Sequence, residues 1–272
     1  MSTLLVDAPP RVRAPYLADW VLSQGLVSLT TAEVAGLLGV PPGQVRSRLH
    51  APAKRGEWVT PARGLWVPVA PRYRVLGGPP ALEYVDALMA YLGSAYYVGW
   101  LSAAAVHGAS HHAAQVTQVA VTRPVEGRQV GRGRIEFYTR SNLGLVPTSP
   151  YRTYSGDVPV STPEATALDV AADTRAGGGL DNAASVIVGM MDEAGLGETN
   201  LVAIARLFPA AAVRRAGWIM ERHGGAGPLT ALREVARAMS ATPSKLAPFK
   251  PGRTSLDRDW NLYINTELDI ET

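Results

Sequence analysis

Residues 30–50 read TTAEVAGLLGVPPGQVRSRLH, and this stretch decides the fold of the N-terminal part of the chain. Its leading threonines can cap a helix with apolar residues on one face, and Gly39 can end that helix. The prolines that follow form a turn and open a second helix, because a proline in the first helical turn needs no N–H. In that second helix Val45 and Leu49 lie one turn apart and face inward. The stretch therefore predicts two helices joined by a short turn.

The segments on either side complete a small unit. Residues 15–24 carry apolar side chains at helical spacing, which predicts a preceding helix. Residues 58–60 and 65–69 are β-type runs, and residues 61–64 between them predict a hairpin with a basic tip. Three helices and a two-stranded wing are the elements of a winged helix-turn-helix.

Polar and basic side chains on the third predicted helix suit DNA recognition. In a winged helix, the second helix of the helix-turn-helix pair enters the major groove. There an arginine can grip guanine and a glutamine can grip adenine, each by two hydrogen bonds. A threonine before the turn can meet a phosphate, and an arginine at the wing tip can meet the backbone or a minor groove. We expect DNA contacts from Thr31, Gln44, Arg46, Ser47, Arg48, His50, Lys54, Arg55 and Arg63.

Pro52 is expected to end or kink the third helix, because its ring removes a backbone donor and crowds the preceding turn. Lys54 and Arg55 would then lie just beyond the helix. Together with Arg11 and Arg13, they would add sequence-independent, salt-sensitive affinity for DNA.

Charge is unevenly distributed along the chain. The 272 residues include 26 Lys and Arg and 23 Asp and Glu, but residues 1–75 alone carry a net charge of +5. The remainder carries −2. A basic N-terminal quarter on a slightly acidic body favours a polyanion-binding head. The alternative is that this unit packs against the body or a partner protein and that its arginines only keep it soluble.

A domain boundary is predicted at residues 76–80, Leu-Gly-Gly-Pro-Pro. Paired glycines free the backbone, and paired prolines block both helix and sheet. The sign of the charge changes at the same place. Residues 1–75 are therefore predicted to form the winged helix-turn-helix domain, and residues 81–272 a separate C-terminal domain.

The larger domain is predicted to be mixed α+β and rich in helices. The pattern indicates strands at 116–122, 135–139 and 158–160, the first two joined by a long Gly- and Arg-rich loop. Ser161 and Glu164 have the spacing of a capping box at the start of a helix. The tail, ending in residues 260–264, is expected to add an extended edge or to pack back on the body. Other helices are predicted at 82–92, 99–107, 181–194, 199–207, 210–223 and 228–240.

Composition excludes several classes of protein. The chain has 0 Cys, so it cannot hold a disulfide, a thiolate zinc site or an iron–sulfur cluster. No apolar run approaches the roughly 20 residues that span a bilayer. The first ten residues lack the basic start and apolar stretch of a signal peptide. We expect a soluble cytoplasmic protein without a membrane partner or a cofactor.

The sequence offers no convincing catalytic or metal-binding motif. His107, His111 and His112 are spaced like a metal cluster, but a glycine intervenes and no carboxylate completes the set, so we expect a polar helix end. Asp257 and Asp259 have the spacing of a nucleotidyltransferase metal site but lack its Gly-Ser turn shortly before, so we expect solvated charges in the tail. A P-loop and a Gly-x-Ser-x-Gly elbow are also missing. The protein is therefore predicted not to be an enzyme.

Five segments together resemble one known family. They are RGLWV at 63–67, YVGWLSAAAVHG at 97–108, VAVT at 119–122, VSTPEATALD at 160–169 and WNL at 260–262. In this order and spacing the chain resembles the antitoxins of abortive-infection E systems, the AbiEi antitoxins of type IV toxin–antitoxin pairs. The arginine that usually follows Thr-Pro-Glu in that family is an alanine here.

The resemblance implies a transcriptional repressor that autoregulates its operon by binding inverted repeats in double-stranded operator DNA. It also implies a nucleotidyltransferase-like toxin as the functional partner, with no stable complex required between the two proteins. One alternative is an antitoxin that neutralises its toxin by direct contact, without sequence-specific DNA binding. Another is an enzyme that acts on nucleic acid or a nucleotide through Asp257 or Asp259.

Overall fold

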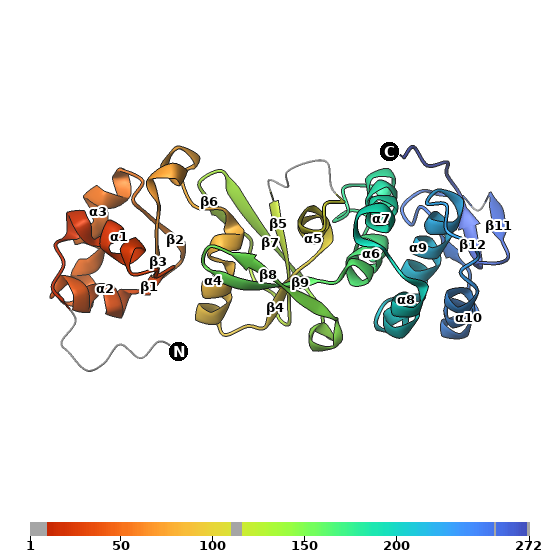
Figure 1. The fold of residues 1–272 in the computed structure, drawn as a ribbon, viewed down its shortest axis with the longest axis horizontal. Coiled ribbons are helices and arrows are strands. Elements are labelled where there is room, and N and C mark those ends of the chain that lie inside the picture. The colour runs from red at the N-terminus through yellow and green to blue at the C-terminus, as the bar shows by residue number, and fades with distance from the viewer. Residues whose placement is uncertain (1–9, 110–115, 253, 271–272) are drawn as a thin grey trace.

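The computed structural model describes residues 10–109, 116–252 and 254–270. Three parts follow one another along the length of the molecule: a small N-terminal unit, a central sheet, and a bundle of helices with the last strands beside it (Figure 1). The architecture is mixed α+β, as predicted. The expectations for the first nine residues, and for His111 and His112, fall outside the described residues.

The N-terminal unit, residues 10–70, has the predicted three helices and hairpin. Its three strands form a sheet in the order β1-β3-β2, with both pairs antiparallel. The elements are α1 (Ala14–Ser23), β1 (Leu29–Thr30), α2 (Thr31–Leu38), a 3₁₀ turn (Pro42–Gln44), α3 (Val45–Lys54), β2 (Trp58–Ala62) and β3 (Leu65–Pro68).

Local signals set the limits of α2 and α3. The Thr30 hydroxyl accepts a hydrogen bond from the Glu33 amide, and the Glu33 carboxylate accepts one from the Thr30 amide, which makes a complete capping box. Gly39 ends α2 with φ 64°. Of the two effects expected of Pro52, an end or a kink, the end is wrong, because α3 continues to Lys54, which was expected to lie beyond the helix. Pro52 is buried and lies in the last turn, where its missing N–H costs a single backbone hydrogen bond.

The central part is a six-stranded mixed sheet in the order β6-β7-β5-β4-β9-β8. Strand β6 lies in the segment predicted to be a loop, so that prediction is wrong for residues 128–130, and strand β8 lies in a segment that the sequence pattern left unassigned. Strand β8 forms an edge and is almost wholly exposed, so it shows no alternation of apolar and polar residues. The elements are α4 (Val85–Leu92), β4 (Tyr96–Val98), α5 (Trp100–Val106), β5 (Val116–Val121), β6 (Arg128–Val130), β7 (Gly133–Thr139), β8 (Thr148–Thr153) and β9 (Gly156–Ser161).

The C-terminal part is helical and carries a small sheet in the order β10-β12-β11. The tail packs back on the body, with Trp260 buried in the helical core. The cap of α6 is Thr162 rather than the predicted Ser161, whose hydroxyl bonds Thr166 instead. The elements are α6 (Pro163–Ala172), α7 (Leu180–Ala194), α8 (Glu198–Ile204), α9 (Ala210–Arg222), α10 (Thr230–Met239), β10 (Ser244–Lys245), β11 (Ser255–Asp257) and β12 (Leu262–Ile264).

A buried arginine on α9 holds the tail in place. Arg215 is 3% exposed, and it donates hydrogen bonds to the carbonyls of Leu246 at 2.7 Å, Lys245 at 3.0 Å and Ala171 of α6. Burial lowers the pKa of Arg215 to about 10, so the guanidinium stays charged at neutral pH. Three otherwise unpaired carbonyls are therefore satisfied by a single side chain.

Strand β3 packs on two hydrophobic cores, one on each of its faces. Trp66 packs in the core formed by the three N-terminal helices. Its neighbours Leu65 and Val67 point the other way, into a second core with Tyr84 and Val85 at the start of α4. Both faces of the strand are thus buried.

The segment predicted to be a linker is closely packed. Gly77 has φ 77°, and a Cβ atom placed on it would lie 2.9 Å from Gly131 Cα in the β6–β7 turn. The Arg132 amide in the same turn donates to the Leu76 carbonyl at 3.0 Å. Glycine is needed here for a close approach between two backbones as well as for its conformation. The division into domains at residues 76–80 stays a prediction.

A buried ion pair joins the sheet to the helical part. Arg140, at the end of β7, pairs with Asp169 on α6 and donates to the Tyr97 hydroxyl at 2.9 Å. Tyr97 in turn donates to Asp169 at 3.0 Å. Burial raises the pKa of Asp169 to about 6, although Arg140 and Tyr97 lower it.

We predict that Asp169→Asn changes the pH dependence of stability. Because the folded-state pKa of Asp169 is raised from 3.8 to about 6, the folded protein binds this proton more readily than the unfolded chain. The contribution is complete below about pH 4 and is lost as the pH rises through about 6. Relative to the variant, the wild type should lose about 3 kcal/mol of unfolding free energy over that interval, measured by urea unfolding at several pH values.

His223 also contributes to the pH dependence of stability, and it does so equally in the wild type and the variant. Burial lowers its pKa, so it adds stability as the pH rises, which is the opposite sign. This contribution is common to both proteins and cancels in the difference between them. Parallel stability curves for wild type and variant would contradict the assignment to Asp169.

Candidate nucleic-acid interface

A groove of about 690 Å³ lies between α3 and the β2–β3 hairpin. Four of the predicted DNA-contacting residues line it, namely Thr31, Arg46, His50 and Arg63. The floor includes the aromatic rings of Trp58 and Trp66, which meet edge to face with centroids 6.4 Å apart. The groove is therefore basic at its rim and apolar at its base.

The geometry of α3 divides the predicted residues between two sides of the helix. Arg46 and His50 are one turn apart and lie on the flank toward the hairpin. By helical spacing, Gln44 and Arg48 fall on the opposite flank. Between the flanks, Ser47 and Lys54 point away from the buried Val45 and Leu49. The six polar and basic residues on the two flanks and between them are all exposed.

The hairpin tip is fastened to the start of α2. Gly64 has φ 91°, and its carbonyl accepts a hydrogen bond from the Thr31 amide at 2.9 Å. The Thr31 hydroxyl donates to the same carbonyl at 3.3 Å and accepts from the Trp66 indole at 3.0 Å. Thr31 thus positions the tip, and a phosphate would have to share its hydroxyl with these partners.

Arg55 differs from the other predicted basic residues. Its guanidinium makes two hydrogen bonds to the Glu57 carboxylate, at 2.7 and 3.1 Å, and these bonds raise its pKa. Its charge is therefore partly neutralised within the protein. In the described part of the chain, no acidic side chain forms an ion pair with Arg46, Arg48 or Arg63. Those three side chains present uncompensated charge.

Two residues at this interface were missed by the sequence reasoning. Trp58 is 3% exposed, and its indole N–H has no partner among the described residues. Tyr91, on α4, donates from its hydroxyl to the Arg63 carbonyl at 2.9 Å. No sequence signal could have indicated Tyr91, because it lies 28 residues away and beyond the predicted boundary.

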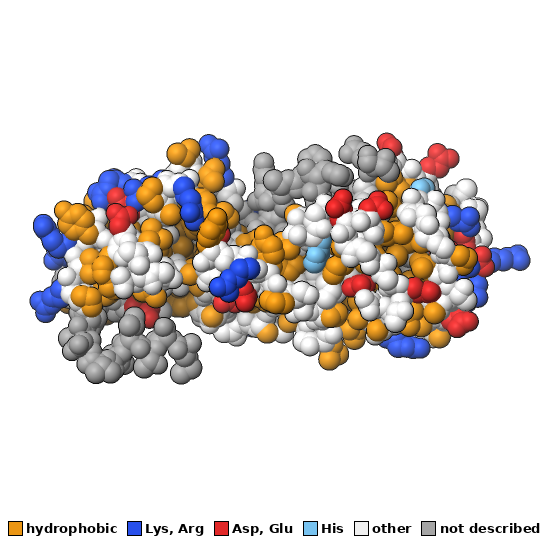
Figure 2. All heavy atoms as spheres, in the orientation of Figure 1, with side chains coloured by type: hydrophobic (Ala, Val, Ile, Leu, Met, Phe, Trp, Pro, Cys, Tyr) orange, Lys and Arg blue, Asp and Glu red, His pale blue; other side chains and the backbone are white. Residues whose placement is uncertain are grey.

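Basic side chains gather over the N-terminal end of the face shown in Figure 2, whereas acidic and basic side chains are mixed at the opposite end. This distribution agrees with the uneven charge of the sequence. Potentials from clustered charges of one sign attract polyanions over distances near the Debye length.

The other candidate sites have structural partners. Asp257 accepts from Trp218 at 3.1 Å and from Arg222 at 3.4 Å, and its side chain is 11% exposed. The expectation of a solvated carboxylate is therefore wrong for Asp257. His107 lies at the end of α5 and bonds the Ser161 carbonyl at 2.8 Å.

Searches of the described residues for two other features found nothing. No cluster of His, Asp and Glu side chains there could hold a metal ion. No helix within those residues is long and apolar enough to cross a membrane.

Comparison with known proteins agrees with the resemblance. Residues 97–222 match the family model described as the AbiEi antitoxin C-terminal domain. This match defines the class of domain that residues 97–222 form, one that belongs to the antitoxins of toxin–antitoxin pairs. That stretch of the chain is an AbiEi-type antitoxin C-terminal domain. That family is one of antitoxins and is not known for catalysis.

A solved structure from Mycobacterium tuberculosis, the RV2827C protein, shares the fold. The two chains superpose with a TM-score of 0.64 at 13% identity, over 94% of this chain and 92% of the other. The likeness therefore extends beyond the matched family region on the N-terminal and the C-terminal side. No curated protein matches the sequence significantly.

We predict that Tyr91→Phe loosens the hairpin tip. The change removes one hydroxyl, and with it the bond to the Arg63 carbonyl. Losing a hydrogen bond worth about 0.5–1.5 kcal/mol should speed local amide exchange roughly 2- to 12-fold. The readout is hydrogen exchange at the Thr31 amide, which bonds the tip.

Tyr16→Phe is the matched control, since Tyr16 lies on α1, is 61% exposed, and its hydroxyl makes no hydrogen bond to the described residues. It should leave the exchange of Thr31 unchanged. Equal exchange rates in the Tyr91 variant and the wild type would show that α4 does not hold the tip.

Proposed function

We propose that the N-terminal unit is a winged helix-turn-helix that binds operator DNA and represses the operon of its own gene. The observation that carries this proposal is the groove between α3 and the hairpin, where Arg46, His50 and Arg63 meet. A helix with exposed basic residues beside a basic hairpin tip suits a duplex, because the helix can enter the major groove while the hairpin follows the backbone.

Both flanks of α3 take part in this proposal. Arg46 and His50 share their flank with Arg63, so the three can face one strand of the duplex across the groove. Gln44 and Arg48 occupy the other flank and lie toward the helix N-terminus, the end that enters deepest in such motifs. Base recognition is therefore expected from both flanks, and sequence-independent contact from Arg63 and Lys54.

In the cell, an antitoxin of this family acts against a toxin. We propose that this toxin is a nucleotidyltransferase-like protein in the cytoplasm, and that the antitoxin controls it without a stable complex, as in type IV systems. The chain itself is proposed to need no metal or cofactor. The alternative is direct neutralisation, in which the N-terminal unit docks on the toxin.

The test is binding of the purified protein to the DNA just upstream of its own gene, against shuffled DNA of equal length, at two salt concentrations. Arg46→Ala and Arg48→Ala should each weaken binding to the native DNA by about 1–3 kcal/mol and reduce the preference for it. Arg63→Ala should weaken binding to both DNAs alike and lower the salt slope by about 1.

The matched control is Arg258→Ala, an exposed arginine in the C-terminal part. It should bind both DNAs as the wild type does. If the wild type binds both DNAs equally and high salt abolishes binding, the repressor proposal fails. Co-purification of a stable complex with the toxin would instead favour direct neutralisation.

A further inference from the structure

A second cleft, of about 190 Å³, lies where the N-terminal unit meets the body. Four stretches of the chain line it: the end of α1 and the turn after it, β3 with the connection that follows, residues 79–83, and the β8–β9 turn. Its lining on the N-terminal side is apolar and includes Leu26, Val27 and Val67. The cleft shares no lining residue with the groove between α3 and the β2–β3 hairpin.

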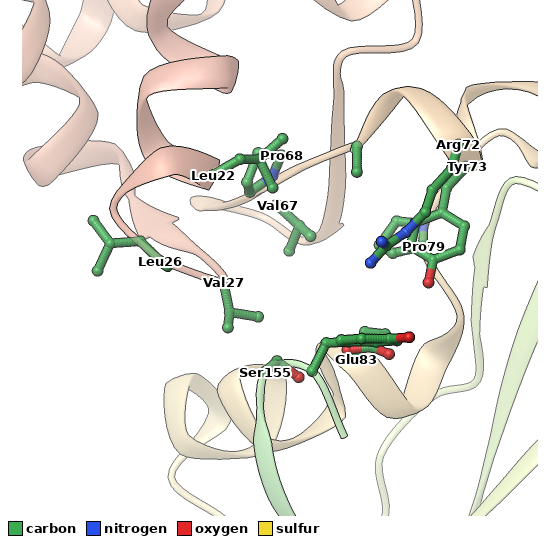
Figure 3. Close-up of a pocket in the computed structure, with 13 residues that line it drawn as sticks. Leu22, Leu26, Val27, Val67, Pro68, Arg72, Tyr73, Pro79, Glu83 and Ser155 are labelled. Carbon is green, nitrogen blue, oxygen red and sulfur yellow. The ribbon is translucent and has the colours of Figure 1, made fainter. Parts of the chain in front are cut away.

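Two side chains of opposite charge, the exposed Arg72 and the partly buried Glu83, line this cleft without an ionic partner. Arg72 and Glu83 both line it, and Figure 3 shows them approaching from different sides. Neither side chain forms an ion pair or a hydrogen bond with any residue that the structure describes. Glu83 is partly buried, where an unpaired carboxylate is costly.

Aromatic rings fix the direction of the arginine. The Arg72 guanidinium lies 4.7 Å from the centroid of the Tyr73 ring and 4.8 Å from that of Tyr154. Such contacts hold a guanidinium over the ring faces but leave its edge N–H groups free to donate. The guanidinium of Arg72 is therefore oriented by the rings, and its N–H groups can still donate hydrogen bonds to a ligand.

We propose that this cleft binds a small zwitterion with an apolar body, such as a free amino acid. Its ammonium group would pair with Glu83, its carboxylate would pair with Arg72, and its apolar part would lie against Val27 and Val67. The volume is below the roughly 300–1,000 Å³ of sites for drug-sized ligands, so it suits a molecule of amino-acid size. Binding would satisfy both charges in one step.

The experiment uses the full chain and three probes: L-leucine, L-phenylalanine and 6-aminohexanoate. The last probe covers a wider spacing between the two charged ends. Isothermal titration calorimetry should show saturable binding of at least one probe by the wild type. Glu83→Gln and Arg72→Gln should each weaken that binding about 10-fold or more, as expected for loss of a charge-assisted hydrogen bond.

Two controls separate the site from general charge effects. Glu126→Gln removes a carboxylate that is 96% exposed and lies outside the cleft, so it should bind the probe as the wild type does. The N-acetyl form of the bound probe lacks the ammonium group and should not bind. Absence of binding by all three probes, unchanged affinity in Glu83→Gln, or equal binding of the acetylated probe would each overturn the proposal.

Discussion

Both faces of strand β3 are buried, and the position of the N-terminal unit depends on this arrangement. On one face, Trp66 packs in the core of the three N-terminal helices. On the other, Leu65 and Val67 pack in the core that includes the start of α4. Complete burial of each such side chain contributes about 1.5–3 kcal/mol. The connection after β3 is held as well, by the close approach of Gly77 to the β6–β7 turn. The unit is thus packed on the body through one shared strand.

This packing also determines the shape of the proposed DNA interface. The hairpin that carries Arg63 is the same hairpin that contains β3, so its base is fixed by the two cores. Its tip is fixed by Thr31 from α2 and by Tyr91 from α4. A surface whose parts are already in place loses less conformational entropy when it binds, which leaves more of the contact energy for affinity. In the proposed complex with DNA, the rest of the chain therefore contributes to binding without contacting the DNA.

Local signals allowed much of the N-terminal unit to be predicted. A capping threonine with glutamate three residues on, and a glycine at the helix end, define α2 from residues that are neighbours in sequence. The same reasoning placed the cap of α6 one residue early, because Ser161 and Thr162 are both suitable and only the fold decides between them. The exposed edge strand β8 has no periodic pattern, so it could not be found.

Contacts between residues far apart in the sequence could not be predicted from local sequence signals. The contacts of Tyr91 with the hairpin, of Arg215 with the tail and of Arg140 with Asp169 each depend on tertiary structure. The predicted DNA-contacting set was drawn from one helix and its surroundings, and the structure divides it. Arg46, His50 and Arg63 come together, whereas Arg55 is taken up by Glu57. The residue types were informative, but their directions required the fold.

A two-sided strand also limits how such a protein can change during evolution. In proteins whose domains are joined only by a flexible linker, a gene fusion can replace one N-terminal domain with another without loss of stability. Here an N-terminal unit taken from another protein would include its own β3. The side chains at positions 65 and 67 of that strand would have to pack against the surface around Tyr84 and Val85. The N-terminal unit and the rest of the chain are therefore expected to be inherited together, and a change in what the proposed interface binds is expected from substitutions on the exposed surface of α3 rather than from exchange of the whole unit.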